Sequence, residues 1–263
     1  MSSVVQIPQA QTSRQILGTR VDATSYELAS SKACAWARHA ESRYISTAPV
    51  YNVMLAYDDP AYHQALSGAD LVVPDGVPVV WALRLLGARH AARVYGPDLT
   101  LHLLAAAQHL NLPVGFYGGT PQVLDLLLLN LRTRFPQLNI AYAFAPPFRP
   151  PTPSEDLETI GQIRDSGARL LFVGIGTPKQ DFWMAQHHGR IPAVMVGVGA
   201  AFDFLAGAKP QAPRWMMRSG LEWLFRLASE PRRLWKRYLL YNPRFVALFA
   251  LQLLGWQRGD QSR

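Results

Sequence analysis

The chain has 263 residues, of which 49% are hydrophobic and 17% charged, a composition typical of a folded globular protein and not of a disordered one. Its single cysteine, Cys34, excludes an intrachain disulfide and leaves no set of ligands for structural zinc, so we expect a reducing compartment, the cytoplasm. The net charge of +8 comes from the last fifth of the sequence, because residues 209–263 hold eleven Lys or Arg against three Asp or Glu, whereas residues 1–208 hold fifteen of each.

Strand-like and helix-like segments alternate along residues 17–208. In chain order, we expect a strand at 17–22, a helix at 25–42, strands at 43–48 and 71–74, helices at 78–86 and 98–110, a strand at 113–117, a helix at 121–135, a strand at 138–144, a helix capped by Ser154, a strand at 169–173, a helix at 179–188 and a strand at 193–198. This succession indicates βαβ units. It predicts an α/β fold, Rossmann-like, with a mostly parallel sheet and helices on both faces.

Three of the expected strands end in glycine-rich turns, which contain Gly118 and Gly119, Gly174 and Gly176, and Gly197 and Gly199. Ligands of parallel sheets bind beyond the carboxyl ends of the strands, and glycine there lets backbone N–H groups approach an anion such as a nucleotide phosphate. The same glycines are also compatible with ordinary tight turns. No G-x-G-x-x-G fingerprint and no P-loop motif occurs, so a nicotinamide-dependent oxidoreductase is a less favoured alternative.

The sequence offers no obvious ligands for a metal ion. It contains no Asp-x-Asp pair, and its seven histidines show no ligand spacing with carboxylates. We therefore expect no metal and no cofactor. The charge of any bound diphosphate would then be balanced by Arg, Lys and backbone N–H groups.

The basic residues 209–263 also hold four of the seven tryptophans, namely Trp215, Trp223, Trp235 and Trp256. Basic residues mixed with tryptophan suit an anionic membrane surface. We expect a disordered tail at 1–16, an α/β core at 17–208 and, at 209–263, a helical appendage that lies on the inner face of the cell membrane. A solvated helical hairpin is the alternative, and nucleic-acid binding is disfavoured because no binding motif accompanies the charge.

No segment has the features of a membrane span or of a secretory signal. The longest apolar runs, such as residues 245–251, are about half of the roughly twenty residues that cross a bilayer. The N-terminus lacks the charged start and the continuous apolar stretch of a signal peptide. We therefore expect a protein that associates with the membrane peripherally.

Six blocks of the sequence closely resemble the WecG/TagA/CpsF glycosyltransferases over about residues 17–242. In order, they are ADLVVPDGVPVVWALRLLG, RVYGPDLT, GFYGGTPQVL, LLFVGIGTPKQDFWMAQH, VGVGAAFDFLAGAKPQAPRWM and GLEWLFRLASEPRRLWKRYL. The resemblance implies transfer of a sugar from a UDP-sugar to a polyprenyl-diphosphate-linked sugar in bacterial cell-surface polysaccharide synthesis. We expect this transfer to invert the anomeric centre and, because the sequence has no acidic pair, to need no metal ion. The donor sugar is a hexose or an N-acetylhexosamine (glucose, N-acetylmannosamine or its uronate), with a slight preference for an exopolysaccharide pathway.

The resemblance assigns catalytic roles to Asp75 and Thr47. Asp75 lies in a Pro-Asp-Gly turn and matches the catalytic base of the family. A carboxylate at a strand end can accept the proton of an acceptor hydroxyl, although an Asp-Gly pair can also simply cap a turn. Thr47 matches the pocket threonine of the family. Many members have an asparagine two positions further on, where this chain has Pro49, so the donor sugar stays open.

The resemblance also implies a set of substrate-binding residues. Gln180 is expected beside the nucleotide sugar, and Asp203 is expected near ribose or uracil unless it only caps a helix. Arginine forks match phosphate oxygens, so the appendage arginines are expected to bind the UDP diphosphate, the lipid diphosphate or both, unless they form only a solvated basic face. These arginines are Arg214, Arg218, Arg226, Arg233 and Arg237.

The expected activity is therefore that of a UDP-sugar-dependent hexosyltransferase. Its expected partners are the UDP-sugar, the polyprenyl-diphosphate-linked acceptor and an anionic membrane surface, and a homo-oligomer is compatible with the sequence. A second hypothesis is a membrane-associated nucleotide-sugar binder without catalytic activity.

Overall fold

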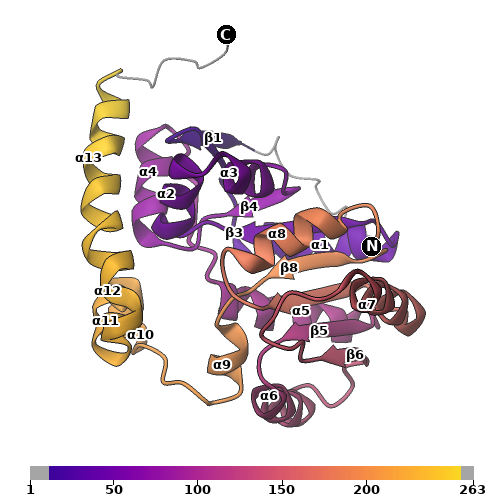
Figure 1. Cartoon of the computed structure of the whole chain (residues 1–263). Helices are drawn as coiled ribbons and strands as arrows, with labels where there is room; N and C mark the ends of the chain where they lie inside the picture. The colour runs from indigo at the N-terminus through magenta and orange to yellow at the C-terminus, as the bar shows by residue number, and fades with distance from the viewer. Residues whose placement is uncertain (1–11, 256–263) are drawn as a thin grey trace, which may run out of the picture.

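A six-stranded parallel sheet lies at the centre of the fold (Figure 1). In the computed structural model, which describes residues 12–255, its strands follow the order β4-β3-β8-β7-β5-β6, and every neighbouring pair is parallel. The strands are β3 (Arg43–Thr47), β4 (Leu71–Val73), β5 (Val114–Gly118), β6 (Ile140–Phe144), β7 (Leu170–Gly174) and β8 (Val194–Gly197). The predicted α/β fold with a parallel sheet is confirmed.

The central strands are buried on both faces. Leu170 and Phe172 of β7 point into one apolar cluster, whereas Leu171 and Val173 point into the other. Because side chains alternate along a strand, a continuous apolar run fills both sides of the sheet. The continuous apolar strands in the sequence therefore correspond to a sheet that is buried on both faces.

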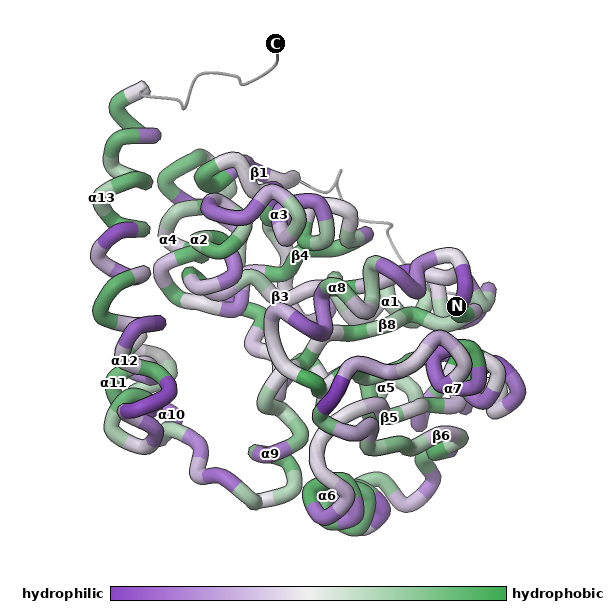
Figure 2. The backbone as a smooth tube through the Cα atoms, in the orientation of Figure 1, coloured by the Kyte–Doolittle hydropathy of each residue, from purple (hydrophilic) through white to green (hydrophobic). Residues whose placement is uncertain are grey.

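Helices cover the sheet on both sides, as predicted. One face carries α1 (Tyr26–Arg38), α5 (Gly96–His109), α6 (Pro121–Arg134) and α9 (Ala201–Leu205). The other face carries α2 (Val50–Asp58), α3 (Pro60–Ser67), α4 (Val77–Leu85), α7 (Pro153–Ser166) and α8 (Lys179–His187). The tube of Figure 2 shows the hydrophobic residues concentrated in the strands and on these helices.

The first part of the described chain differs from the expectation. Residues 13–16, assigned to a disordered tail, form β1 (Ser13–Ile16), which pairs with β2 (Thr19–Asp22) in an antiparallel hairpin. The single strand expected at 17–22 is thus a turn followed by β2. The hairpin is fixed to the sheet because the backbone N–H of Val72 donates to the buried Asp22 carboxylate at 2.8 Å.

The sequence pattern also fails to predict two helices and the N-cap residue of a third. The helices α2 and α3 fill residues 50–67, for which no element is expected. Pro60 stands in the first turn of α3, where its missing N–H costs nothing, and Asp59 caps that helix. The helix α7 is capped by Thr152 and not by Ser154, because Thr152 and Glu155 form a reciprocal capping box.

Four helices follow the α/β core. They are α10 (Arg214–Arg218), α11 (Glu222–Ser229), α12 (Pro231–Leu239) and α13 (Tyr241–Leu253), and residues 209–255 are called the appendage below. Pro231 begins α12, where its missing N–H costs nothing. Phe245 and Phe249 of α13 belong to the apolar cluster around α2, so the appendage is packed on the core and not separate from it (Figure 1).

The appendage is also held to the core by polar contacts. The guanidinium of Arg244 donates to both carboxylate oxygens of Asp58, at 2.5 and 2.7 Å, and the amide of Gln252 bonds the backbone of Gln15 and of Leu17.

Within residues 12–255, no helix is long and apolar enough to cross a membrane. Trp256 lies outside the described residues, and the expected domain boundary at residue 209 stays a prediction.

Replacing Gly118 with Ala should destabilise the fold by about 2 kcal/mol or more. Gly118 has φ +136°, and a Cβ there would lie 2.5 Å from the backbone of Gly174 on the neighbouring strand. Gly161, inside α7, has open space around it, so Gly161→Ala should stabilise the protein by about 0.5–1 kcal/mol. Urea unfolding of both variants measures these changes, and equal stabilities would contradict the close strand approach.

Candidate active site

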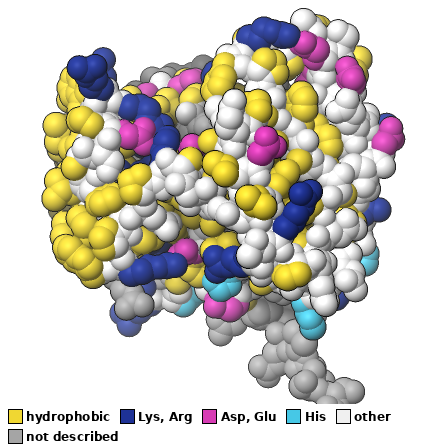
Figure 3. Space-filling model, turned by 90° about the horizontal axis from the view of Figure 1, so that it is seen from below, with side chains coloured by type: hydrophobic (Ala, Val, Ile, Leu, Met, Phe, Trp, Pro, Cys, Tyr) yellow, Lys and Arg dark blue, Asp and Glu magenta, His cyan; other side chains and the backbone are white. Residues whose placement is uncertain are grey.

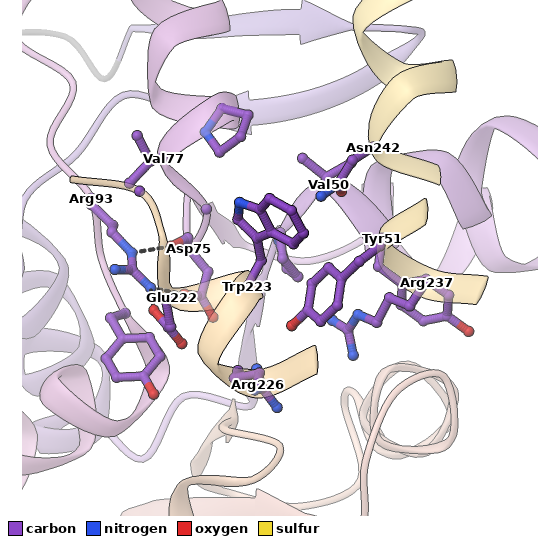
Figure 4. A pocket seen from close by; sticks show the side chains of 16 residues that line it. Val50, Tyr51, Asp75, Val77, Arg93, Glu222, Trp223, Arg226, Arg237 and Asn242 are labelled. Atoms are coloured by element: carbon purple, nitrogen blue, oxygen red, sulfur yellow. Dashed lines mark hydrogen bonds and ion pairs between the residues drawn. The ribbon is translucent and has the colours of Figure 1, made fainter. Parts of the chain in front are cut away.

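A cleft opens between the carboxyl end of β4 and the appendage (Figure 4). Its volume is about 670 Å³ when its open mouth is included. The core lines it with Pro49, Val50, Tyr51, Asp75, Gly76, Val77, Pro78, Arg93 and Tyr95, and the appendage lines it with Gly220, Glu222, Trp223, Arg226, Arg237, Tyr238 and Asn242. The cleft is thus built by two parts of the chain that are distant in sequence.

Asp75 reaches the cleft because of its place at the end of the edge strand β4. The strand is fully buried, and the chain then turns at Pro74 and Asp75 before α4 begins. The N-cap of α4 is Gly76, and no side chain caps that helix. The Asp75 carboxylate lines the cleft, and its role as a base stays a prediction.

Arg93 holds Asp75 in place and connects it to the appendage. The Nε of Arg93 donates to the backbone carbonyl of Asp75 at 2.5 Å, and its Nη2 lies 3.6 Å from the Asp75 carboxylate. The same guanidinium forms an ion pair with Glu222 of α11 and donates to the carbonyl of Met217 at 3.3 Å. It also lies over the ring of Tyr95, 4.6 Å from its centre.

The surroundings of Asp75 change its protonation. The pKa of Asp75 is raised to about 6, chiefly by burial and also by the charge of Glu222, which together outweigh the lowering by Arg93, Arg226 and Arg237. The carboxylate is therefore mostly ionised at neutral pH and still basic enough to accept a proton. A pKa near the working pH is what a general base requires.

Two cationic side chains of the appendage face the cleft without a carboxylate partner. Arg226 of α11 and Arg237 of α12 are both half-buried, and neither forms an ion pair with any residue of 12–255. The Arg237 guanidinium lies 4.4 Å from the centre of the Tyr51 ring, and burial lowers the pKa of Arg237. Desolvated guanidinium groups of this kind are suited to binding a phosphate or diphosphate.

The other predicted arginines lie elsewhere. Arg214 is 66% exposed and pairs with Asp98 at 2.9 Å, and Arg233 is 54% exposed and pairs with Glu230. Neither lines the cleft. The side chain of Arg218 lies outside the described part of the structure. Arg214 belongs to α10, whereas Arg226 and Arg237 belong to α11 and α12, which Pro231 separates.

Thr47, at the end of β3, and Gln180, in the first turn of α8, are both buried. Thr47 ends β3 and its carbonyl accepts from the Asn52 side chain at 2.8 Å. Gln180 is 1% exposed, and its Oε1 accepts from the backbone N–H of Gly199 at 3.0 Å. Neither residue lines the cleft of Asp75. Each supports the carboxyl edge of the sheet beside it.

The predicted glycines lie further along the same edge. The backbone N–H of Gly119 donates to the carbonyl of Gly174 at 3.2 Å, so part of this turn binds its neighbouring strand. Gly176 has φ +82° and open space where a Cβ would stand. Thus Gly118 has a packing role, whereas the position of Gly176 is open, and ligand binding by these glycines stays a prediction.

Asp203 takes part in a bridge between core and appendage. Its carboxylate lies 3.6 Å from the Lys209 ammonium, which is also 3.6 Å from Glu230. Beside this bridge is a second hollow, which Lys209, Phe204, Phe225 and Arg226 help to line. Arg226 therefore borders both hollows.

Several residues of the cleft were not singled out in the sequence. Arg93 and Glu222 stand inside two of the quoted blocks, but no spacing rule connects residues 129 positions apart. Tyr51 lies in a stretch for which no element was expected.

Among residues 12–255, no group of three or more His, Cys, Asp or Glu could hold a metal ion. Metal independence stays a prediction.

Comparison with known proteins gives consistent matches. The sequence model described as "Glycosyl transferase WecG/TagA/CpsF family" matches residues 14–259. The chain is 33% identical over 192 residues to an N-acetylglucosaminyldiphosphoundecaprenol N-acetyl-beta-D-mannosaminyltransferase of Bacillus spizizenii, covering 73% of this chain and 72% of the relative. It is 30% identical over 197 residues to the protein of that name in Bacillus subtilis, covering 74% of each.

Replacing Glu222 with Gln should lower the pKa of Asp75 below about 6. The substitution removes a negative charge that disfavours the Asp75 carboxylate, and it frees Arg93 to pair with that carboxylate. The carboxyl ¹³C chemical shift of Asp75 followed through a pH titration measures the change. Glu230→Gln is the matched control, since Glu230 pairs with Arg233 and Lys209 instead. An unchanged or higher pKa in Glu222→Gln would contradict this coupling.

Proposed function

The chain belongs to the WecG/TagA/CpsF family of glycosyltransferases, and we propose that it moves a hexosyl or N-acetylhexosaminyl group from a UDP-sugar to a sugar linked to polyprenyl diphosphate. The observation that carries this proposal is a basic carboxylate, Asp75, in one cleft with two cationic side chains that lack carboxylate partners. The names of the two relatives support the acceptor class, because both name a diphosphoundecaprenol-linked sugar.

In the proposed reaction, Asp75 is the general base. Its carboxylate accepts the proton of the acceptor hydroxyl while that oxygen forms a bond to the anomeric carbon of the donor sugar. The bond between this carbon and the UDP oxygen breaks, and the electron pair leaves with UDP. Attack and departure on opposite faces invert the anomeric centre. Arg93 positions Asp75 through its backbone and side-chain contacts.

The negative charge of the diphosphates is balanced by Arg226 and Arg237 in this proposal. Their donors lie in a half-buried cleft, where an interaction with phosphate oxygens is stronger than in water. Because they are already desolvated and held against Phe204 and Tyr51, little reorganisation accompanies binding. This supports a transfer that needs no metal ion.

We place the nucleotide part of the donor along the carboxyl edge of β5, β7 and β8. The turns that contain Gly176 and the pair Gly118 and Gly119 would let backbone groups approach the nucleotide. The buried Gln180 side chain holds the next turn by accepting a hydrogen bond from the N–H of Gly199. Thr47 ends the strand beside Asp75. Asp203 pairs with Lys209, which lines the second hollow, and Arg226 lines both this hollow and the cleft, so we assign the ribose or uracil to the second hollow.

The outer surface of the appendage supports contact with a membrane. Trp215 and Trp235 are 65% and 44% exposed, and Leu239 and Leu240 are more than half exposed. Figure 3 shows hydrophobic side chains gathered over the appendage, with Lys and Arg at their margin. This mixture suits the anionic inner face of the cell membrane, where the lipid-linked acceptor would be found. We therefore propose a cytoplasmic protein bound peripherally to that face.

A panel of UDP-sugars offered with a polyprenyl-diphosphate-linked sugar tests the function. Mass spectrometry should detect an acceptor enlarged by one sugar, and EDTA should leave the rate unchanged. Asp75→Asn should lower kcat about 10²- to 10⁴-fold, because the base is lost, while UDP affinity changes only a few fold. Binding of UDP-sugar without any transfer would indicate a non-catalytic binder, and equal loss of UDP binding in Asp75→Asn would make Asp75 structural.

Replacing Arg237 with Ala should separate catalysis from membrane binding. Turnover should fall about 10²- to 10³-fold, because a donor to the diphosphate is lost, while sedimentation with anionic liposomes changes little. Arg232→Ala, on the exposed side of the same helix, is the matched control. It should keep full turnover and weaken liposome binding modestly at low salt, and high salt should shrink this difference because it screens the attraction that Arg232 supplies. Equal turnover of the two variants would show that Arg237 belongs to a solvated basic face.

A further inference from the structure

The exposed face of α4 is apolar and begins at the cleft. Val77, in the first turn of this helix, lines the cleft. Trp81 and Leu85 follow at four-residue intervals and are 57% and 66% exposed. Residues four apart lie on one side of a helix, so these three form a stripe that extends about 12 Å from the cleft.

Folding of the core does not require this stripe. The opposite side of α4 supplies Val79, Ala82 and Leu83 to the core, and these are buried. Arg84, between Trp81 and Leu85, uses its guanidinium to donate to the carbonyl of Ala91. Among the described residues, the side chain of Trp81 has no hydrogen-bond partner and no ring contact. A large aromatic side chain is therefore left open beside the cleft.

The stripe begins where α4 contacts the appendage. Gly220 lies so close to Val77 that a Cβ on it would be 3.4 Å from the Val77 side chain. The far end of α4, at Leu86, accepts from Arg14 of β1, and the far end of α13 bonds Gln15 of the same strand. Both helices thus run from the cleft to β1 (Figure 1). An apolar path leads out of the cleft on the side where α13 stands.

We propose that Val77, Trp81 and Leu85 bind the first isoprene units of the polyprenyl chain of the acceptor, an inference that rests on the proposed function. The chain is covalently attached to the diphosphate, so a diphosphate held by Arg226 and Arg237 forces the lipid to leave through the mouth of the cleft. The stripe is continuous with that mouth. A branched apolar chain gains most from flat and branched apolar side chains of this kind.

The test compares two acceptors with the double variant Trp81→Gln, Leu85→Gln in detergent. One acceptor carries the full polyprenyl chain, and the other carries a single isoprene unit. For the long acceptor, KM should rise about ten-fold or more while kcat stays within about two-fold, because apolar contact is lost. For the short acceptor, neither value should change. Leu129→Gln, at a 59% exposed leucine of α6, is the matched control and should behave like the wild type.

Two further outcomes decide between explanations. An equal KM change for both acceptors, together with weaker liposome sedimentation, would overturn the proposal in favour of contact with bulk lipid.

If the wild type transfers no sugar from any donor, the proposed function fails. Binding of polyprenyl diphosphate alone, compared with inorganic diphosphate, then still tests the stripe. The double variant should bind polyprenyl diphosphate about ten-fold more weakly and inorganic diphosphate equally well, and unchanged binding of both would overturn the inference.

Discussion

The contacts of one guanidinium, that of Arg93, join the two parts from which the cleft is made. Arg93 binds the backbone of Asp75 in the core, and it binds Glu222 and the carbonyl of Met217 in the appendage. The same bonds that dock the appendage therefore also hold Asp75, the proposed base. A cleft of this kind exists only while both parts are in contact, so its chemistry depends on docking as much as on the side chains themselves.

The pairing of the remaining charges explains why the cleft is cationic. Glu222 is occupied by Arg93, and Glu230 is occupied by Arg233 and Lys209. This leaves Arg226 and Arg237 without carboxylates of their own. Burial raises the pKa of Asp75, and these two arginines lower it, so an incoming diphosphate that neutralised them would make Asp75 more basic. Substrate binding and the strength of the base are thereby coupled.

Much of the fold follows from the sequence, because continuous apolar strands such as Leu170–Val173 can be buried only inside a covered sheet. The helices α2 and α3 were missed, since Pro49 and Pro60 suggest breaks although both stand at helix starts. Asp75 was identified from its resemblance to a known family and not from physical reasoning. Arg93 and Glu222 could not be paired in advance, because their contact depends on how the appendage packs and not on any local pattern.

The order in which the cleft residues occur along the chain has a consequence for synthesis on the ribosome. All six strands of the sheet are made by Gly197, yet Glu222, Arg226 and Arg237 follow only afterwards. Folding during translation proceeds from the N-terminus. A nascent chain can therefore assemble its sheet before it has the cations of the cleft. Most of the large exposed hydrophobic side chains of residues 12–255 also belong to the appendage, so the surface proposed to contact a membrane is synthesised after the sheet.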